Sequence, residues 1–327
     1  MNTDKNQQEV NNENIRYVMV SPENIQQNVA NDEIDLRELF KAIWQGKWII
    51  IAATAVFAVA SAYYALSLPN IYKSETILAP VTEDASLKIP GQLGGLAALA
   101  GVSLGGGGAD KTALALEVLK SRDFLGRFIE KHDLFIPVLA AEGWNSTDNS
   151  LVIDDEIYDV NTKQWVRDVK PPFAAKPSLF EAHKKFMQLL DVYQDATTGM
   201  ISLSVKHYSP FLAQQWVTLL VRDINGEMRG RELTEAQNSI NYLTEQIEKT
   251  NISDVRTMLF SLIEEQTKTL MLANVRQEYV FNTIDGAIVP EEKDSPKRFL
   301  IILLFTVVGG FFATVFVILS NAFFRKL

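Results

Sequence analysis

Two apolar blocks without a single charged residue lie near the two ends of the chain. The first is Trp48–Leu68, WIIIAATAVFAVASAYYALSL, and the second is Phe299–Leu319, FLIILLFTVVGGFFATVFVIL. A helix of either length covers about 30 Å, the thickness of the hydrocarbon core of a bilayer. Trp48 and Tyr64 lie toward the two edges of the first block, as in an aromatic belt. We therefore expect two transmembrane helices; the alternative is a pair of buried core helices, which seldom run this long without a charge.

Two spans place both ends of the chain on one side of the membrane and the long middle segment on the other. Basic residues flank the spans five against five, so the positive-inside count alone does not orient the chain. The first span usually dominates, and it has three basic residues before it and two after it. The middle segment is therefore expected to be periplasmic or extracellular. The predicted segments are a cytoplasmic tail with an amphipathic helix at 1–47, transmembrane helices at 48–68 and 299–320, the large external domain at 69–298 and a cytoplasmic tail at 321–327.

Composition and the placement of ionisable residues exclude several classes of function. The net charge is -9 and the isoelectric point is near 5.0, so nucleic acid is not an expected partner. The absence of cysteine excludes disulfides, thiolate nucleophiles and cysteine zinc sites. His132, His183 and His207 do not form a metal-binding pair. The acidic stretch Asp154–Asp159 is interpreted as a solvated loop, with a divalent-ion site as the alternative. We expect no metal, no cofactor and no active site.

One glycine-rich stretch approaches the pattern of a phosphate-binding loop. Gly105–Leu114 reads GGGGADKTAL, but Asp110 stands where the pattern needs a glycine and would repel phosphate. The residues before the glycines are not strand-like, and ATP is scarce outside the cytoplasm. We therefore expect no nucleotide at Lys111. The wider segment Gly91–Gly108 is interpreted as a mobile apolar loop that faces a pore, a lipid or a partner.

Short regular elements are predicted on both sides of this loop. Ile71–Val81 has the composition of a strand, and Met200–Tyr208 alternates between apolar and polar residues as a strand does. Ala113–His132 carries apolar residues at helical spacing and is predicted to be one helix. Phe180–Leu190 is predicted to be a short helix.

The segment between Pro210 and Pro290 contains no proline, which permits long helices. Five apolar residues within it step by 3, 4, 3 and 4, the spacing of a heptad seam. These residues are Leu233, Ala236, Ile240, Leu243 and Ile247. The stretch Asn251–Asp254, NISD, supplies helix-breaking and capping residues, and a second helical run, Val255–Val280, follows it.

The chain has to be back at the membrane by Phe299. A long helix that leads away from the membrane therefore requires a second helix that runs back toward it. We predict an antiparallel hairpin at 211–280 that projects from a base formed by 69–210 and 281–298. A lone hairpin of this length buries little surface, so we expect its seam to pack against neighbouring copies of the chain. The alternative is an intramolecular coiled coil.

Two adjacent glycines, Gly309 and Gly310, lie in the second apolar block. Small residues let membrane helices approach closely, so this pair is assigned to helix packing. The alternative is a flexible pair that the helix tolerates.

Five stretches of the chain, which overlap these predicted elements, have a recognisable sequence pattern. They are EIDLRELFKAIWQGKWIII at Glu33–Ile51, LPNIYKSETILAPV at Leu68–Val81, ALEVLKSRDFLGRFI at Ala115–Ile129, HYSPFLAQQWVTLLVRDIN at His207–Asn225 and TIDGAIVPEEKDSPKRFLIIL at Thr283–Leu303. In this order they resemble the Wzz family of O-antigen chain-length determinants, the polysaccharide co-polymerases. The last stretch resembles the family's proline-containing motif but holds only Pro290 and Pro296, fewer prolines than the family tends to carry.

This resemblance implies an α+β membrane protein in which two transmembrane helices flank a periplasmic α/β base domain with a long antiparallel helical extension. It implies a ring-like, non-catalytic homo-oligomer of the bacterial inner membrane. The implied partners are the O-antigen polymerase, the lipid-linked polysaccharide and membrane lipid, and the implied role is to set the modal length of lipopolysaccharide O-antigen. The expected packing positions are Leu233, Ile240, Leu243, Ile247, Pro290, Pro296, Gly309 and Gly310.

Three other classes are weighed against this one. A co-polymerase for capsule or exopolysaccharide export would work with a separate tyrosine kinase. A two-span receptor would need a cytoplasmic output module, and eight residues follow Leu319. A sugar transferase would need catalytic residues, and no motif in the sequence supplies them.

The predicted topology can be tested with single cysteines, because the chain has none of its own. Cysteines at Asn149 and Thr250 are expected to react with a membrane-impermeant thiol reagent in intact spheroplasts, whereas a cysteine at Asn12 is expected to react only after lysis. Labelling is read from a mass shift on a gel. Reaction at the Asn12 position alone would invert the topology.

Overall fold

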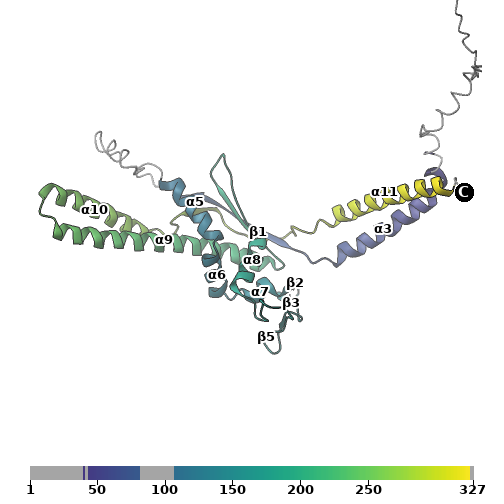
Figure 1. Ribbon diagram of the computed structural model, residues 1–327, viewed down its shortest axis with the longest axis horizontal. Helices are drawn as coiled ribbons and strands as arrows, with labels where there is room; N and C mark the ends of the chain where they lie inside the picture. Colours follow the sequence, from purple (N-terminus) through teal and green to yellow (C-terminus); the bar gives the residue numbers. More distant parts are fainter. Residues whose placement is uncertain (1–39, 41–42, 82–106, 325–327) are drawn as a thin grey trace, which may run out of the picture. The chain divides into compact units, whose positions relative to one another are not determined.

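The computed structural model describes residues 40, 43–81 and 107–324 (Figure 1). The predictions for the N-terminal tail and for most of the glycine-rich segment fall outside these residues. Backbone contacts divide the chain into two units, which are described separately. One unit contains the chain up to Tyr63 and from Leu300 onward, and the other runs from Tyr64 to Phe299.

Two long apolar helices make up most of the described part of the first unit. They are α3 (Lys47–Ser67) and α11 (Arg298–Phe324), and they lie where the two apolar blocks predict helices. Both are long and apolar enough to cross a membrane. Their large side chains are mostly exposed, for example Tyr63 at 79% and Phe311 at 64%. This exposure differs from that of core helices in a soluble protein, so the structure has two candidate membrane spans.

The second unit is organised around one antiparallel sheet. Its strands, in the order β6-β7-β1-β8, are β6 (Leu190–Gln194), β7 (Ile201–His207), β1 (Tyr72–Pro80) and β8 (Phe281–Asp285). Along β1 every second side chain is buried, at Ser74, Thr76 and Leu78, as in a strand with one covered face. The strands predicted at Ile71–Val81 and Met200–Tyr208 are confirmed as β1 and β7, the central pair of the sheet.

In the described part of the chain, four helices lie between β1 and β6. They are α5 (Gly107–Lys120), α6 (Arg122–Lys131), α7 (Phe135–Leu139) and α8 (Leu179–Leu189). The prediction of one helix at Ala113–His132 is wrong, because the helix is interrupted at Ser121. The side chain of Ser121 accepts a hydrogen bond from the backbone N–H of Phe124 at 3.2 Å and caps the start of α6. The predicted short helix at Phe180–Leu190 corresponds to α8, displaced by one residue.

Two small hairpins follow α7. They are formed by β2 (Ala141–Asn145) with β3 (Ser150–Ile153) and by β4 (Tyr158–Asp159) with β5 (Gln164–Trp165). Between and within them, acidic side chains hold turns. Asp154 accepts a hydrogen bond from the backbone N–H of Glu156 at 2.9 Å, and Asp159 accepts one from Asn161 at 2.8 Å. Within the described residues no group of three His, Asp or Glu side chains could hold a metal ion.

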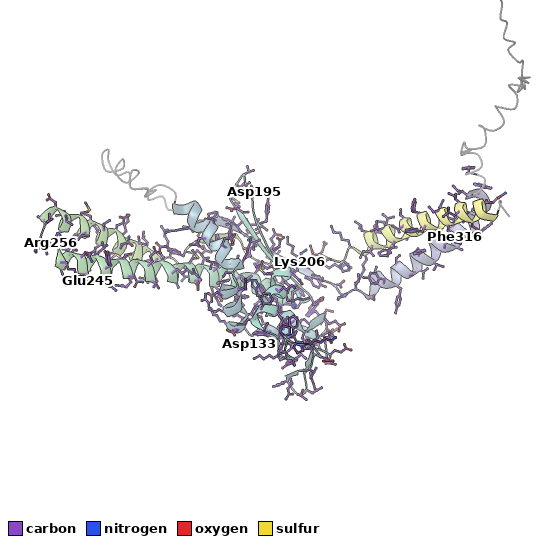
Figure 2. The ribbon with its side chains drawn as sticks, in the orientation of Figure 1. Asp133, Asp195, Lys206, Glu245, Arg256 and Phe316 are labelled. Atoms are coloured by element: carbon purple, nitrogen blue, oxygen red, sulfur yellow. The ribbon has the colours of Figure 1, made fainter. Side chains whose placement is uncertain are left out.

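Two helices, α9 (Pro210–Lys249) and α10 (Ser253–Val275), run antiparallel and side by side (Figure 1). Ser209 caps α9 by accepting a hydrogen bond from the N–H of Leu212, and Pro210 occupies the first turn, where its missing N–H is not needed. The helices are joined by residues 250–252, which overlap the stretch Asn251–Asp254 where the sequence predicts a break. Figure 2 labels Glu245 and Arg256 near the closed end of this hairpin.

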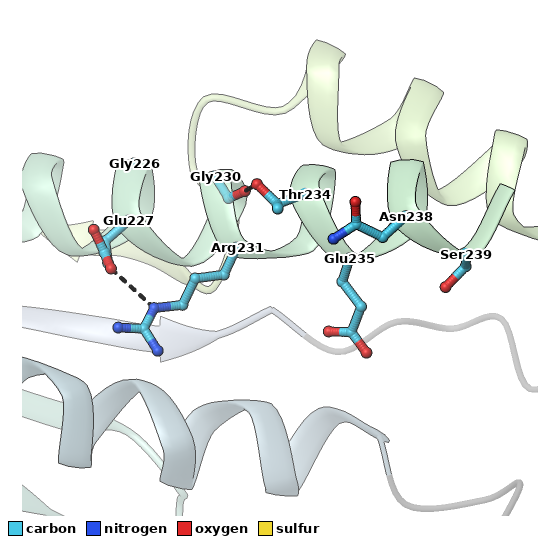
Figure 3. Close-up of a pocket in the computed structure, with 8 residues that line it drawn as sticks. All are labelled: Gly226, Glu227, Gly230, Arg231, Thr234, Glu235, Asn238 and Ser239. Atoms are coloured by element: carbon cyan, nitrogen blue, oxygen red, sulfur yellow. Dashed lines mark hydrogen bonds and ion pairs between the residues drawn. The ribbon is translucent and has the colours of Figure 1, made fainter. Parts of the chain in front are cut away.

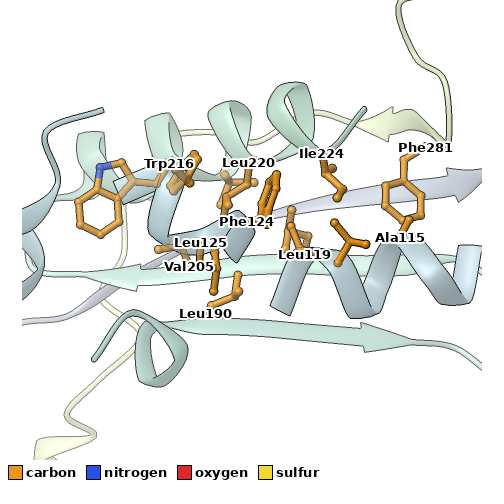
Figure 4. Close-up of a cluster of buried hydrophobic side chains, with 14 of the residues drawn as sticks. Ala115, Leu119, Phe124, Leu125, Leu190, Val205, Trp216, Leu220, Ile224 and Phe281 are labelled. Carbon is orange, nitrogen blue, oxygen red and sulfur yellow. The ribbon is translucent and has the colours of Figure 1, made fainter. Parts of the chain in front are cut away.

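The first half of α9 belongs to the core of the base and not to the projecting hairpin. Trp216, Leu220 and Ile224 are completely buried and point toward α6 and the sheet (Figure 4). They meet side chains of α5, α6, α8 and the strands, including Phe128 and Phe186. At about 25 cal/mol for each Å² of buried apolar surface, these large residues dominate the stability of the domain. The free part of α9 therefore begins after about residue 228, later than the predicted start at 211.

A buried histidine joins this core to the start of α9. The Nε2–H of His207 donates to the carbonyl oxygen of Pro137 at 3.1 Å, and its Nδ1 accepts from the N–H of Ser209 at 3.0 Å. The ring lies 4.7 Å from that of Trp216. Burial lowers the pKa of His207 below its ordinary value of 6.5, because the charged ring would lose its hydration.

This geometry predicts a stability that depends on pH. Below pH 6.5 the unfolded chain protonates His207 while the folded chain does not, so the free energy of unfolding falls as the pH drops through that window. The thermal unfolding midpoint of the detergent-solubilised protein is expected to decrease from pH 7.5 to pH values just below 6.5. His207→Gln is expected to lower the midpoint at pH 7.5 but to show a smaller dependence on pH. An equal pH dependence in both proteins would contradict this role.

Candidate functional site

The predicted seam of α9 faces α10 of the same chain. Ala236 and Ile247 are buried, and Leu233, Ile240 and Leu243 are half-buried. The covered apolar residues of α10 recur at helical spacing and are Leu259, Ile263, Leu270 and Ala273. α10 of the same chain returns along α9 and covers part of this seam, as the intramolecular alternative expects. Packing of the half-buried seam residues against neighbouring copies stays a prediction.

The opposite face of α10 carries large apolar side chains that nothing in the described part of the chain covers. Phe260 is 55% exposed, Met271 61% and Val275 81%. These positions are separated by eleven and four residues, so they lie along one stripe of the helix. Exposed apolar stripes of this kind mark surfaces that bind another protein or a membrane.

A shallow groove of about 660 Å³ runs along another side of α9 (Figure 3). Its floor contains Gly226 and Gly230, and a Cβ atom placed at either glycine would meet no described atom within 4 Å. Arg231 and Thr234 line the groove beside them. Glycine in the middle of a helix destabilises it by about 1 kcal/mol relative to alanine. The packing within the described chain therefore gives no reason for these two glycines.

Charged side chains beside this groove join α6 to α9. Arg127 contacts Glu227 at 3.0 Å, and Arg231 contacts the same carboxylate at 2.9 Å. The hydrogen bonds from Arg127, and then those from Arg231, keep the pKa of Glu227 below its ordinary value. One turn earlier, Lys131 contacts Asp223 at 3.0 Å. These carboxylates are held ionised by fixed cations, an arrangement suited to holding helices together and not to proton transfer.

The lysine of the glycine-rich stretch lies inside a helix. Asp110, Lys111 and Thr112 all belong to α5. The Nζ atom of Lys111 is 3.3 Å from a carboxylate oxygen of Glu232 in α9 and 5.9 Å from the ring centre of Tyr279. A phosphate-binding lysine would follow a loop that opens a helix, whereas this one ties α5 to the hairpin.

A strap of hydrogen bonds joins the two ends of the second unit. The guanidinium group of Arg298 donates to the carbonyl oxygens of Ala65 and Leu68, both at 3.0 Å. The backbone N–H of Ile71 donates to the carbonyl oxygen of Ser295 at 2.9 Å. The last carbonyl groups of a helix have no partner within the helix, so Arg298 satisfies acceptors that the end of α3 leaves open.

The two predicted prolines are placed along the segment that forms this strap. Pro296 directly follows Ser295, and Pro290 lies six residues before Pro296. Both prolines are half-buried. The sequence predicts a packing role for the prolines and gives no sign of one for Arg298. A basic residue at the edge of a span is common, and only its contact with Ala65 and Leu68 distinguishes this one.

Within the first unit, small residues lie where α3 and α11 meet. A Cβ atom at Gly309 would be 2.5 Å from the ring of Phe57, and one at Gly310 would be 3.4 Å from Thr54. Gly46, just before α3, lies as closely against Val317. The glycine pair thus faces the other helix, and Gly46 is a third close contact that no sequence motif indicates.

Residues 32–132 match the family model described as Wzz, chain length determinant protein. The match identifies a Wzz region. It contains α3, β1, α5 and α6, that is, the first candidate span and the start of the folded unit. It bears out the resemblance to the Wzz family that the sequence motifs indicate.

Two solved structures are similar to the chain that carries this Wzz region. One, described as a full-length bacterial polysaccharide co-polymerase, is 13% identical with a TM-score of 0.37, over 90% of this chain and 99% of that chain. The other, a fragment of WzzB, a polysaccharide co-polymerase from Salmonella Typhimurium, is 11% identical with a TM-score of 0.27, over 69% of this chain and 100% of that chain. A comparison with curated proteins gives no match.

The contact at Gly309 can be tested by cross-linking. Because a Cβ atom at Gly310 would lie against Thr54, the pair Thr54→Cys and Gly310→Cys is expected to form a disulfide under mild oxidation. Adding Gly309→Leu forces a side chain into Phe57 and is expected to cost about 1–3 kcal/mol, which strongly reduces the cross-linked fraction. Val308→Leu, a neighbouring exposed position, is the control and should leave that fraction unchanged. Equal cross-linking in all three backgrounds would rule out close packing at Gly309.

Proposed function

We propose that this protein regulates the modal chain length of lipopolysaccharide O-antigen without catalysing a reaction, as an oligomer of the bacterial inner membrane that works with the O-antigen polymerase. The observation that carries the proposal is the Wzz match over residues 32–132. The two candidate membrane spans at the ends of the described chain support it, since they would hold the domain between them close to the membrane where such a polymer is made.

The proposed topology places residues 69–298 in the periplasm and both tails in the cytoplasm. The basic residues before the first span favour this orientation. With this topology the α9–α10 hairpin stands on the periplasmic side, where it is available to the polymerase and to the growing lipid-linked polysaccharide. The predicted division into tails, spans, base and extension is part of the same proposal, with the first half of α9 assigned to the base.

A homo-oligomer is the proposed active form. Because α10 covers part of the seam of α9, we propose that a neighbouring copy uses another surface. The stripe of Phe260, Met271 and Val275 is apolar and uncovered in the described chain, and it lies on the side of α10 away from α9. Covering three such side chains would contribute several kcal/mol to each contact between copies.

The absence of chemistry is proposed on the same grounds. Charged pairs on the domain, such as Arg127 with Glu227, join one helix to another at the surface. A regulator without an active site has to act through the geometry of its assembly and through contact with the polymerase or its product.

The deciding experiment is the lipopolysaccharide ladder of a strain that lacks this protein. We expect polymerisation to continue and the modal band to disappear, with restoration by the wild-type chain. An unchanged ladder together with an altered amount or size of capsule or exopolysaccharide would transfer the role to that polymer and to a separate kinase.

The oligomer surface makes a prediction of its own. Phe260→Asp combined with Met271→Asp is expected to break contacts between copies, because each would place an unpaired carboxylate in an apolar interface at a cost of several kcal/mol. Native mass spectrometry of the detergent-solubilised protein should show smaller assemblies, and the O-antigen bands should broaden while polymer is still made. Ser261→Asp adds the same charge on a polar side of the helix and is the control. A normal assembly and ladder in the double variant would exclude this surface.

A further inference from the structure

A pocket of about 420 Å³ lies between the start of β1 and the β2–β3 hairpin, separate from the surfaces described above. Three aromatic side chains line it: Tyr72 of β1, Trp144 of β2 and Tyr208, which follows β7. All three are half-buried, so each presents part of its ring to the pocket and part to the protein. Three rings from separate parts of the chain around one concave surface are an arrangement typical of a ligand site.

Trp144 is held in place on three sides. Its Nε1–H donates to the side-chain oxygen of Asn149 at 2.8 Å. Its ring packs edge-on against Tyr72, with 5.7 Å between the ring centres, and lies 6.1 Å from the ring of Phe211 at the start of α9. Because its orientation is fixed before any ligand arrives, little entropy is lost when a ligand stacks on it.

Two polar side chains complete the lining. The side-chain oxygen of Asn70 is shielded from solvent and has no hydrogen-bond donor in the described part of the chain. An acceptor left in this state costs about 1–3 kcal/mol, and a turn of the Asn70 amide toward the pocket would let a ligand hydroxyl group satisfy it. The carboxylate of Glu142 lies on the exposed side of the pocket and can accept hydrogen bonds from two adjacent hydroxyl groups of a ligand.

The charge of the pocket selects the class of ligand. Among the described residues that line it, Glu142 alone is charged at neutral pH, and no lysine or arginine is present. A phosphate or another anion would meet a repelling carboxylate and no cation. A pyranose ring fits instead, because one of its faces is made of C–H groups that pack on an aromatic ring while its hydroxyl groups donate to carboxylate and amide oxygens.

We propose that this pocket is a saccharide site that holds an uncharged sugar unit of the polymer whose length the protein regulates, with Trp144 as the stacking platform and Glu142 and Asn70 as acceptors. The proposal rests on the proposed function for the identity of the polymer. Ser67, the last residue of α3, and Pro69 line the same pocket. If α3 spans the membrane, the site lies at the membrane surface, where the first sugars of a lipid-linked chain emerge.

The site can be tested with the full-length protein in nanodiscs of zwitterionic lipid. The probe is the O-polysaccharide released by mild acid from the lipopolysaccharide of the bacterium that naturally makes this protein. Binding is followed by saturation-transfer NMR and titration calorimetry. We expect the wild type to bind, Trp144→Ala to bind about tenfold more weakly, and Glu142→Gln to bind several-fold more weakly. Trp144→Phe keeps an aromatic face and should retain most of the affinity. A thermal unfolding midpoint near that of the wild type shows that each variant is folded.

Trp165 offers a matched control. It is a half-buried tryptophan that packs edge-on against Tyr158 in the β4–β5 hairpin, outside the pocket. Trp165→Ala should bind the polysaccharide as the wild type does. Wild-type affinity in both Trp144→Ala and Glu142→Gln, or no binding by the wild type, would overturn the saccharide site. Displacement of the polysaccharide by glycerophosphoglycerol, a soluble phospholipid head group, would overturn it in favour of a lipid site.

The outcome for the pocket is separable from the outcome for the proposed function. Loss of the modal band in the deletion strain without polysaccharide binding would overturn the pocket and leave the regulator intact. An unchanged ladder in the deletion strain would overturn the O-antigen role, whatever the purified protein binds.

Discussion

The fold of the second unit depends on one constraint: its two ends meet. Arg298 donates to the carbonyl groups at the end of α3, and the backbone of Ile71 bonds to that of Ser295, so the chain leaves and returns at one point. β1 and β8, the first and last strands of the unit, are accordingly neighbours in the sheet. A closed path of this kind requires every outgoing element to be balanced by a returning one. The long α9 is balanced by α10, and the remaining elements fill the base.

One continuous helix, α9, runs through both the base and the hairpin. Its first half is fixed by Trp216, Leu220 and Ile224 in the core, and its second half carries the seam that α10 covers. A force applied at the closed end of the hairpin therefore reaches the buried ring of Trp216 through a helix of 40 residues. Phe211, in the first turn of the same helix, contacts Trp144, so α9 is in contact with the pocket at one end and forms the hairpin at the other.

The two apolar helices follow from the length of the uncharged blocks, and the central strands follow from composition and alternation. The hairpin follows from the proline-free segment and the return of the chain to the membrane. Periodicity was not enough to identify partners. The heptad spacing of Leu233 to Ile247 is the same whether the covering helix comes from the same chain or from another copy. The break at Ser121 was missed because serine also occurs inside helices, and only the bond to Phe124 shows that it is a cap. The pocket was out of reach, since Asn70 and Trp144 are brought together only by the tertiary fold.

Gly226 and Gly230 stand at the place where α9 leaves the core, with no described neighbour close enough to explain them. Together they make that turn of the helix less stable by about 2 kcal/mol than alanines would. A hairpin attached through such a turn is held firmly at its root and loosely just beyond it. A molecule that binds only the straight, fully helical form of α9 shifts the local equilibrium of this turn toward the helix. Binding along the hairpin therefore makes the base of the hairpin more rigid.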